Sequence, residues 1–320
     1  MASTSRMRIG IFTGGPSAER EISLKSAAHV LRSLDATRYD ARIIEIDTHG
    51  EWADTAPIDL ALIAMHGTFA EDGTLQTKLK ELGIPYTGSN PIASALGMDK
   101  ARAHERIAAR GLSNPRSIVC TRDTPRIRAQ IEQSFGFPCF IKPNASGSSV
   151  GMSLVDEPSA LDAALATAFA ECETVLVQER IRGREFSCGT LGNSGQTDIL
   201  SLPVVEIITT ARFFDYDAKY DASKTREVCP AEINAALAAR IQDAARIAHE
   251  ALGCDGLTRS DFIASEDGTI YFLEINTIPG MTEASICPKE AAALGWSFAD
   301  LLDKQIVLAL QRHAATHRTA

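Results

Sequence analysis

Three oxygen-bearing side chains lie close together in the apolar stretch SDFIASEDGTIYFLEINTIPGMT, residues 260–282. Asp267-Gly268 is a favoured two-residue hairpin loop, and counting outward from it along an antiparallel ladder puts Asp261 opposite Glu274. Asn276 follows two residues later and shares their face. Like charges placed opposite one another destabilise a sheet unless something lies between them. The pattern therefore indicates either a hard cation such as Mg²⁺, completed by substrate phosphates, or a solvated hairpin face.

A loop of small residues, in the stretch FIKPNASGSSVG, follows an apolar strand pattern at residues 140–151. Gly147 lets backbone amides approach phosphate oxygens, and Ser148 and Ser149 add hydroxyl donors. Lys142 ends the strand beside this loop. The order GxxxxGK[ST] is missing, so the loop is not a P-loop. It is either a phosphate site or an ordinary flexible hairpin loop.

Two cations are placed where they could meet an anion. Lys100 lies in the first turn of an expected helix, where the helix dipole disfavours a positive charge, although surface lysines are common in helices. Arg259 precedes Asp261 by two residues and shares its face. Such a cation can stabilise developing negative charge in a reaction, or form a structural salt bridge to the acids.

Three further polar residues could contact a ligand, and each has a purely structural alternative. Glu19 occupies the second position of a helix that we expect Ser17 to cap, where the helix dipole alone can explain an acid. His66 follows a buried strand pattern, at the edge where open α/β sheets bind ligands. It could therefore contact a ligand, or it could be a loop histidine whose hydrogen bonds are made within the protein. Glu185 could accept a hydrogen bond from a ribose hydroxyl, or begin an exposed strand.

The elements that must position these residues fall into three units. Residues 7–88 alternate strand and helix patterns, with helices expected over about 20–34 and 73–82, as in an open parallel α/β sheet. Two α+β patterns follow, and the second contains a polar segment without regular structure over residues 209–230, a length typical of a lid or binding loop. The expected domains are residues 1–95, 96–183 and 184–320.

Composition limits the class of protein. The chain has 320 residues and a formal net charge of −9, which argues against nucleic acid or an anionic membrane as a partner. The seven cysteines are at least 16 residues apart, so there is no CxxC motif, and we expect reduced thiols. We find neither an apolar signal sequence nor an apolar run of about 20 residues, and therefore expect a cytoplasmic protein.

These motifs, in this order, resemble those of the D-alanine:D-alanine ligase family in the ATP-grasp superfamily. The resemblance covers almost the whole chain, through segments such as GGPSAEREISL, HGTFAEDGTLQ, ASALGMDK, IKPNASGSSVG, IRGREF, FFDYDAKY, LGCDGLTRSDF and FLEINTIPGMT. It implies an N-terminal open parallel-sheet α/β domain that completes the amino-acid site. An ATP-grasp fold of two α+β subdomains, which hold ATP between them, would follow.

The resemblance also implies a role for each matching residue. ATP would contact Lys100, Lys142, Gly147, Ser148, Ser149, Gln178, Glu179, Ile181, Glu185 and Lys219. Two Mg²⁺ (or Mn²⁺) ions would be held by Asp261, Glu274 and Asn276. The amino-acid substrates would contact Glu19, His66, Arg259, Ser285 and Ile286. The catalytic group would comprise Glu19, Ser148, Tyr220, Arg259 and Gly280.

The implied reaction joins two D-alanines through an acyl phosphate, for peptidoglycan precursor synthesis, and the implied assembly is a homodimer. The alternatives are D-serine or D-lactate as the acceptor, or a role outside wall synthesis. Tyr220 favours D-alanine as the acceptor. A non-catalytic ATP-binding module is a further alternative. Glu19, Tyr220, Arg259 and Ser285 argue against it, because a mere binding module needs none of them.

Five positions depart from the pattern of the family. Ala70 and Thr77 replace usual glycines, Ser146 replaces a frequent glutamate, Gln178 replaces an acid and Ser260 replaces an aliphatic residue. None of them removes a candidate metal ligand or Arg259. We expect Ala70 and Thr77 to affect substrate selectivity and rate rather than the class of reaction.

Overall fold

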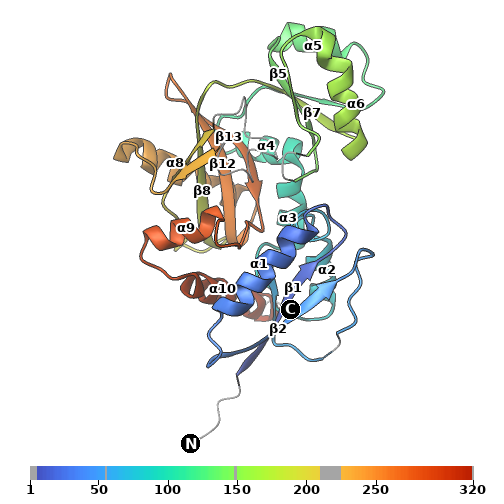
Figure 1. Cartoon of the computed structure of the whole chain (residues 1–320). Coiled ribbons are helices and arrows are strands. Elements are labelled where there is room, and N and C mark those ends of the chain that lie inside the picture. Colours follow the sequence, from blue (N-terminus) through green and yellow to red (C-terminus); the bar gives the residue numbers. More distant parts are fainter. Residues whose placement is uncertain (1–5, 55, 148–149, 210–224, 319–320) are drawn as a thin grey trace, which may run out of the picture.

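The structure is a computed structural model that describes the chain except residues 1–5, 55, 148–149, 210–224 and 319–320 (Figure 1). The predicted roles of Ser148, Ser149, Lys219 and Tyr220 therefore lie outside the described residues. So does most of the expected closing loop.

The N-terminal unit is a parallel sheet with helices on both faces. Its strands are β1 (Met7–Gly14), β2 (Tyr39–Ile46) and β3 (Leu60–Ile63), in the order β2-β1-β3. Ile9 and Ile11 pack into one core with helices α1 (Arg20–Ser33) and α10 (Phe298–Arg318). Phe12, which points the other way, packs in a second core with α2 (Thr74–Glu81). The predicted parallel α/β unit is confirmed, but the last helix of the chain also covers it (Figure 1).

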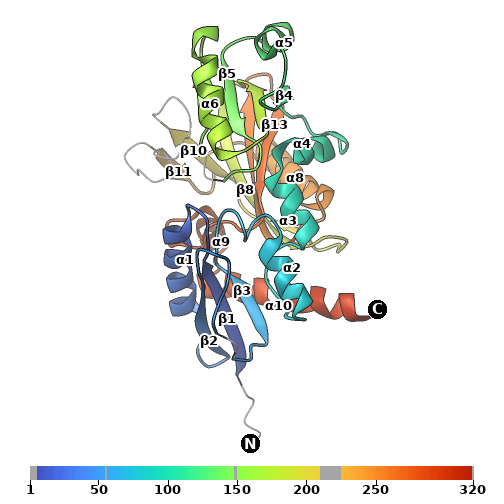
Figure 2. The same cartoon turned by 90° about the vertical axis from the view of Figure 1, so that its right-hand side faces the viewer.

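The middle unit is a four-stranded antiparallel sheet. Its strands are β4 (Ser117–Cys120), β5 (Cys139–Pro143), β6 (Ser153–Val155) and β7 (Val175–Glu179), in the order β4-β7-β5-β6. Helices α5 (Ile127–Ser134) and α6 (Leu161–Glu171), with a short 3-10 turn η1 (Pro158–Ala160), pack on it and share one apolar core with the strands. Figure 2 shows this unit at the end of the molecule opposite the N-terminal sheet.

The largest sheet lies between those two units (Figure 2). It comprises β8 (Gly183–Asn193), β9 (Leu200–Ser201), β10 (Val205–Thr209), β11 (Thr225–Val228), β12 (Asp255–Ser265) and β13 (Ile270–Asn276). Its main strand order is β11-β10-β8-β12-β13, all antiparallel.

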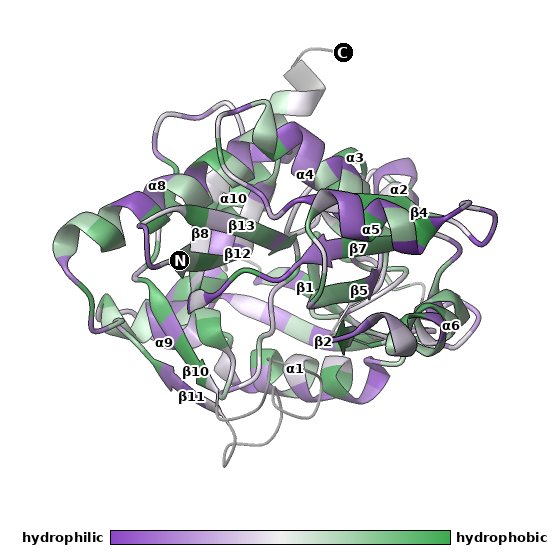
Figure 3. Cartoon of the chain, turned by 90° about the horizontal axis from the view of Figure 1, so that it is seen from above, coloured by the Kyte–Doolittle hydropathy of each residue, from purple (hydrophilic) through white to green (hydrophobic). Residues whose placement is uncertain are grey.

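Besides α10, four helices pack on the largest sheet, and three of these four share one core. They are α3 (Pro91–Met98), α4 (Lys100–Ala108) and α8 (Ala235–Ala251), which pack with Phe186, Phe262 and Phe272. The fourth, α9 (Ile286–Ala293), contacts β8. Figure 3 shows apolar residues gathered along inner strands such as β5 and β7, with polar residues mainly on the outer helices and loops.

The β12–β13 hairpin corrects one prediction and confirms another. Ser265 N–H donates to Thr269 O at 2.9 Å, so the connection consists of residues 266–268 rather than two residues. A bulge directly after Asp261 offsets the extra residue, and Asp261 therefore still pairs with Glu274. The predicted pairing is confirmed, although the predicted turn length is wrong.

Two sequence expectations concern features outside the fold itself. All seven cysteines carry free thiols. Over the described part of the chain, we find no helix with the length and apolar character needed to cross a bilayer.

Candidate active site

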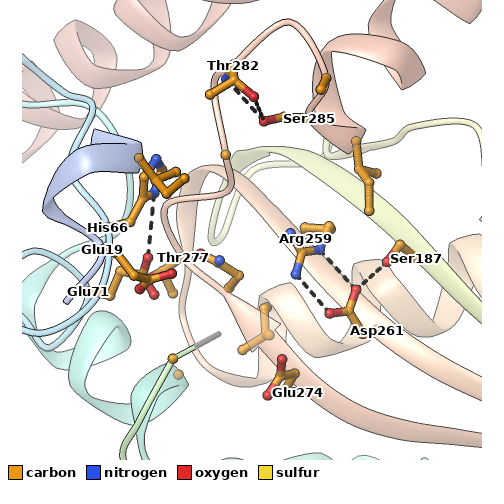
Figure 4. A pocket seen from close by; sticks show the side chains of 18 of the residues that line it. Glu19, His66, Glu71, Ser187, Arg259, Asp261, Glu274, Thr277, Thr282 and Ser285 are labelled. Carbon is orange, nitrogen blue, oxygen red and sulfur yellow. Dashed lines mark hydrogen bonds and ion pairs between the residues drawn. The ribbon is translucent and has the colours of Figure 1, made fainter. Parts of the chain in front are cut away.

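A cavity of about 490 Å³ lies where α1, the segment after β3 and one face of the largest sheet meet (Figure 4). Its wall combines residues from stretches that lie far apart in the chain, from Glu19 to Ile286. The predicted site residues that line it are Glu19, His66, Lys100, Gly147, Arg259, Asp261, Glu274, Asn276, Gly280, Ser285 and Ile286.

Two smaller cavities, of about 70 and 80 Å³, continue from it between the four-stranded sheet and the largest sheet. The first shares Lys100, Asp261 and Glu274 with the large cavity, and the second shares Lys142 and Glu185 with the first. The second also contains the remaining predicted nucleotide contacts that the structure describes, Gln178, Glu179 and Ile181. The cavities thus form one row that runs from the large cavity, past Lys100 and Glu274, to Gln178 and Glu179.

The predicted metal ligands lie at the junction of these cavities. Asp261 accepts hydrogen bonds from Arg259 Nε (3.0 Å), Arg259 Nη2 (2.9 Å) and the Ser187 hydroxyl (Figure 4). A carboxylate has about four acceptor sites, so Asp261 Oδ2 can still accept a ligand. Glu274 Oε2 lies 3.6 Å from Lys100 Nζ, and Asn276 Oδ1 accepts from the Ile278 amide at 2.8 Å.

This donor set fits a hard cation, because it offers two carboxylates and an amide oxygen on one sheet face. Within the residues that the structure describes, no group of three or more His, Cys, Asp or Glu side chains gathers around a point. A cation here would therefore depend on ligand oxygens to complete its coordination, as Mg²⁺ does with phosphates.

Arg259 is a buried cation directed into the large cavity (Figure 4). Burial lowers its pKa, but the charge and hydrogen bonds of Asp261 raise the pKa by more, so the guanidinium stays charged. Its two hydrogen bonds to Asp261 use Nε and Nη2, which leaves Nη1 for a ligand. A fixed charge in a buried site can stabilise an oxyanion without reorganising water.

The start of α9 also faces the same cavity. Ser285 is the N-cap residue of this helix, and its Oγ lies 2.8 Å from Thr282 Oγ1. Ile286 is the first helical residue, and its N–H is one of the amides that a helix start leaves for an anion. Gly280 lies beside it, and a Cβ there would come within 2.7 Å of Ser285 Oγ and displace that hydroxyl.

The start of α1 presents Glu19 to the cavity, and here the capping prediction is wrong. Glu19 itself occupies the N-cap position of α1, and its N–H donates to Ser17 Oγ at 2.9 Å in the preceding turn. A Cβ on Gly147 would come within 3.0 Å of Glu19 Oε2, and a Cβ on Gly67 within 2.8 Å. Both glycines therefore allow backbone to approach this carboxylate closely.

His66 belongs to a buried cluster at the same end of the cavity. Its Nδ1 lies 3.1 Å from Ile278 O and 3.7 Å from Glu71 Oε1, and its Nε2 lies 3.0 Å from Ser26 Oγ. Burial lowers the pKa of His66, but Glu71 and Glu19 raise it by more. Burial and the charge of Glu19 raise the pKa of Glu71. The cluster therefore retains a proton beside Glu19 more readily than isolated side chains would.

The segment from Lys142 to Ser146, which precedes the predicted phosphate loop, contacts α4 through backbone and side-chain hydrogen bonds. Lys100 Nζ donates to Ser146 O at 2.7 Å, and Lys142 Nζ donates to Gln178 Oε1 at 2.8 Å. Asn144 accepts from the Ala101 amide at 2.9 Å. Both lysines are thus held near the small cavities.

Sequence reasoning missed Glu71, Ser187 and Asn144. Glu71 lies in the segment HGTFAEDG, five residues after His66, and that short spacing is the signal that could have identified it. Ser187 is 74 residues from its partner Asp261, and no local pattern marks it.

Two antiparallel sheets that face each other across a row of cavities, with charged groups at the junction, define an ATP-grasp protein (Figure 2). Sequence profiles described as the C-terminus and the N-terminus of D-ala D-ala ligase match residues 111–307 and 8–57. The chain belongs to the D-alanine–D-alanine ligase family, as its motifs predicted.

Similar proteins extend over almost the same length. A D-alanine–D-alanine ligase from Desulfotalea psychrophila is 43% identical over 316 residues, covering 96% of each chain. The solved structure of a D-alanine–D-alanine ligase from Bacillus anthracis complexed with ATP is 33% identical, with a TM-score of 0.84, covering 98% of this chain and all of that one. The VanG D-Ala:D-Ser ligase from Enterococcus faecalis is 34% identical, with a TM-score of 0.86, covering 95% and 100%.

Proposed function

We propose that the protein joins two D-alanines into D-alanyl-D-alanine with hydrolysis of ATP to ADP and phosphate, and supplies the dipeptide for peptidoglycan precursors. The observation that carries the proposal is the convergence of a buried cation, Arg259, an acid at a helix start, Glu19, and an anion site at Ser285 in one cavity. That cavity opens into a row suited to a nucleotide. The names of the similar ligases support the choice of D-alanine and ATP as substrates.

In the first step, the carboxylate of the first D-alanine attacks the γ-phosphoryl group of ATP, and ADP leaves. Glu19 would receive the ammonium of this substrate and so orient its carboxylate toward the phosphates. Lys100 and Lys142 line the small cavity beside Asp261 and Glu274 and would hold the phosphates of ATP in line. Two Mg²⁺ or Mn²⁺ ions held by Asp261, Glu274 and Asn276 would neutralise phosphate charge.

In the second step, the amine of the second D-alanine attacks the acyl carbonyl, a C–N bond forms, and phosphate leaves with the C–O bonding electrons. Ser285 and the Ile286 amide would hold the carboxylate of this acceptor. Arg259 and the Gly280 amide would stabilise the oxyanion that forms on the attacked carbonyl. Catalysis would then consist of positioning and charge stabilisation, with no protein nucleophile.

The first test is phosphate release from ATP and Mg²⁺ with D-alanine, with D-serine and D-lactate as competing acceptors, together with mass analysis of the product. We expect D-alanyl-D-alanine as the main product, and loss of turnover in Glu274→Gln at the Mg²⁺ concentration that just saturates the wild type. If ATP binds but D-alanine supports no turnover, the proposed function is wrong. A dominant D-alanyl-D-serine product would instead point to the acceptor in the name of the VanG enzyme.

We further propose a homodimeric, cytoplasmic enzyme whose partners are these small molecules, with neither nucleic acid nor a membrane. The free cysteines and the acidic net charge are consistent with that setting. Light scattering tests the dimer, and fractionation of cells that express the protein tests the compartment.

A further inference from the structure

One fully buried acid near the cavity has no role in the reaction described above. Glu290 lies on α9, about one turn after Ser285 and Ile286, and none of its surface is exposed. Its Oε1 accepts a hydrogen bond from the Gly189 amide of β8 at 2.8 Å, across 101 residues of sequence. Its Oε2 makes no hydrogen bond of good geometry within the described residues, although the weak donor of the Cys287 thiol acts on the carboxyl. A buried carboxyl with one oxygen unsatisfied is costly, so its position calls for an explanation.

The contact joins the two elements that form the acceptor end of the cavity. Gly189 is the residue of β8 that pairs with Arg259 of β12. A Cβ at Gly189 would lie only 2.5 Å from Glu290 Oε2, so the carboxyl packs directly against the strand backbone. The helix that carries Ser285 and Ile286 is therefore attached to the sheet next to Arg259.

We propose that Glu290 is a positioning residue for the acceptor: its buried carboxyl fastens α9 to β8, and so holds Ser285 and the Ile286 amide in register with Arg259. The inference rests on the proposed function, because it concerns the site assigned there to the second D-alanine. Glu290 does not line the cavity and contacts no substrate in this scheme. It acts through the helix that it anchors.

The charge of Glu290 gives this anchor a pH dependence. Burial raises the pKa of Glu290 to about 8, while the Gly189 amide, the Cys287 thiol and Arg259 lower it by less. Asp261 is the other charged group that acts on it. Glu290 is thus a neutral acid at pH 7, and a buried negative charge forms above pH 8 beside a site for a carboxylate.

The other titratable groups around Glu290 keep their charge in that range. Burial raises the pKa of the Cys188 and Cys287 thiols well above the ordinary value, and raises the pKa of Cys229 to about 11. Arg259 stays a cation because Asp261 raises its pKa by more than burial lowers it. A change near pH 8 in this cluster is therefore assigned to Glu290.

The kinetic test compares Glu290→Gln, which keeps the shape and the carbonyl acceptor, with Glu290→Ala, which removes both. Ala292→Gln is the control, because it adds the same side chain on an exposed position of α9. We expect Glu290→Ala to raise the KM of the acceptor at least tenfold at pH 7, with kcat and the KM for ATP within threefold. Between pH 7 and 9.5, the acceptor KM of the wild type should rise roughly 3- to 10-fold more than the acceptor KM of Glu290→Gln, because only the wild type gains a charge.

An acceptor KM that Glu290→Ala leaves within twofold of the wild type would overturn the positioning role. Identical pH profiles for the wild type and Glu290→Gln would overturn the charge effect. Hydrogen exchange of the α9 amides gives a readout that needs neither turnover nor the alanine variant. Exchange should accelerate above pH 8 in the wild type relative to Glu290→Gln, and equal exchange would refute the effect of the Glu290 charge on α9 even if the protein proved not to be a D-alanine ligase.

Discussion

Replacing Arg259 with methionine tests the central charge of the site. Arg259 and Asp261 are both largely buried and share two hydrogen bonds of 3.0 and 2.9 Å. Removing one partner of a buried ion pair leaves the other charge uncompensated, which costs about 3–5 kcal/mol. Removing a donor aimed at a developing oxyanion costs about 10²- to 10³-fold in kcat. The variant should therefore lose both stability and rate.

The two losses can be separated by a second substitution. In Arg259→Met, the melting temperature should fall by roughly 6–15 °C, taking about 2–3 °C for each kcal/mol in a chain of this size. Adding Asp261→Asn removes the uncompensated charge, so a large part of the lost stability should return while activity does not.

Arg246→Met is the matched control for loss of an arginine. Arg246 forms surface pairs on α8 with Asp243 and Glu250, and such pairs contribute only about 0–1 kcal/mol. Thermal unfolding and phosphate release with D-alanine measure both effects. A folded Arg259→Met enzyme with kcat within tenfold of the wild type would refute the oxyanion role. A double variant no more stable than the single one would refute the account of the buried pair.

Three further predictions follow from the site and the core. Gly147→Ala places a Cβ 3.0 Å from Glu19 Oε2, so the KM for D-alanine should rise several-fold, and unchanged steady-state constants would contradict that close approach. Glu274→Gln should raise the Mg²⁺ concentration for half-maximal activity at least tenfold while ATP still binds, as checked by Mg²⁺ titration and calorimetry. Burial lowers the pKa of both His104 and His249 to about 4, so the unfolded chain binds protons first as pH falls below about 6.5. The free energy of unfolding should drop by about 3 kcal/mol per histidine by pH 4, and His249→Gln should flatten the pH dependence of urea midpoints between pH 7 and 4.5.

Local sequence patterns predicted the structure well where residues close in sequence are also close in space. The pairing of Asp261 with Glu274 follows from a hairpin, although a bulge and a longer turn had to offset each other for the count to hold. The start of α1 was placed correctly to within a residue, but the N-cap was not, because Ser17 lies two residues before the N-cap Glu19 and accepts a hydrogen bond from the Glu19 amide. Errors of this kind come from local hydrogen bonds that several neighbouring side chains can make.

The sequence by itself determined the alternation of strands and helices, the residues suited to phosphate and metal chemistry, and the family. Only the tertiary structure showed that α10 covers the N-terminal sheet, that Glu71 lies against His66, and that Glu290 reaches Gly189. Periodicity shows which face of a helix is apolar, but not which of several apolar surfaces it will cover. A buried polar contact between residues 101 positions apart has no local signal, because it depends on how whole elements pack.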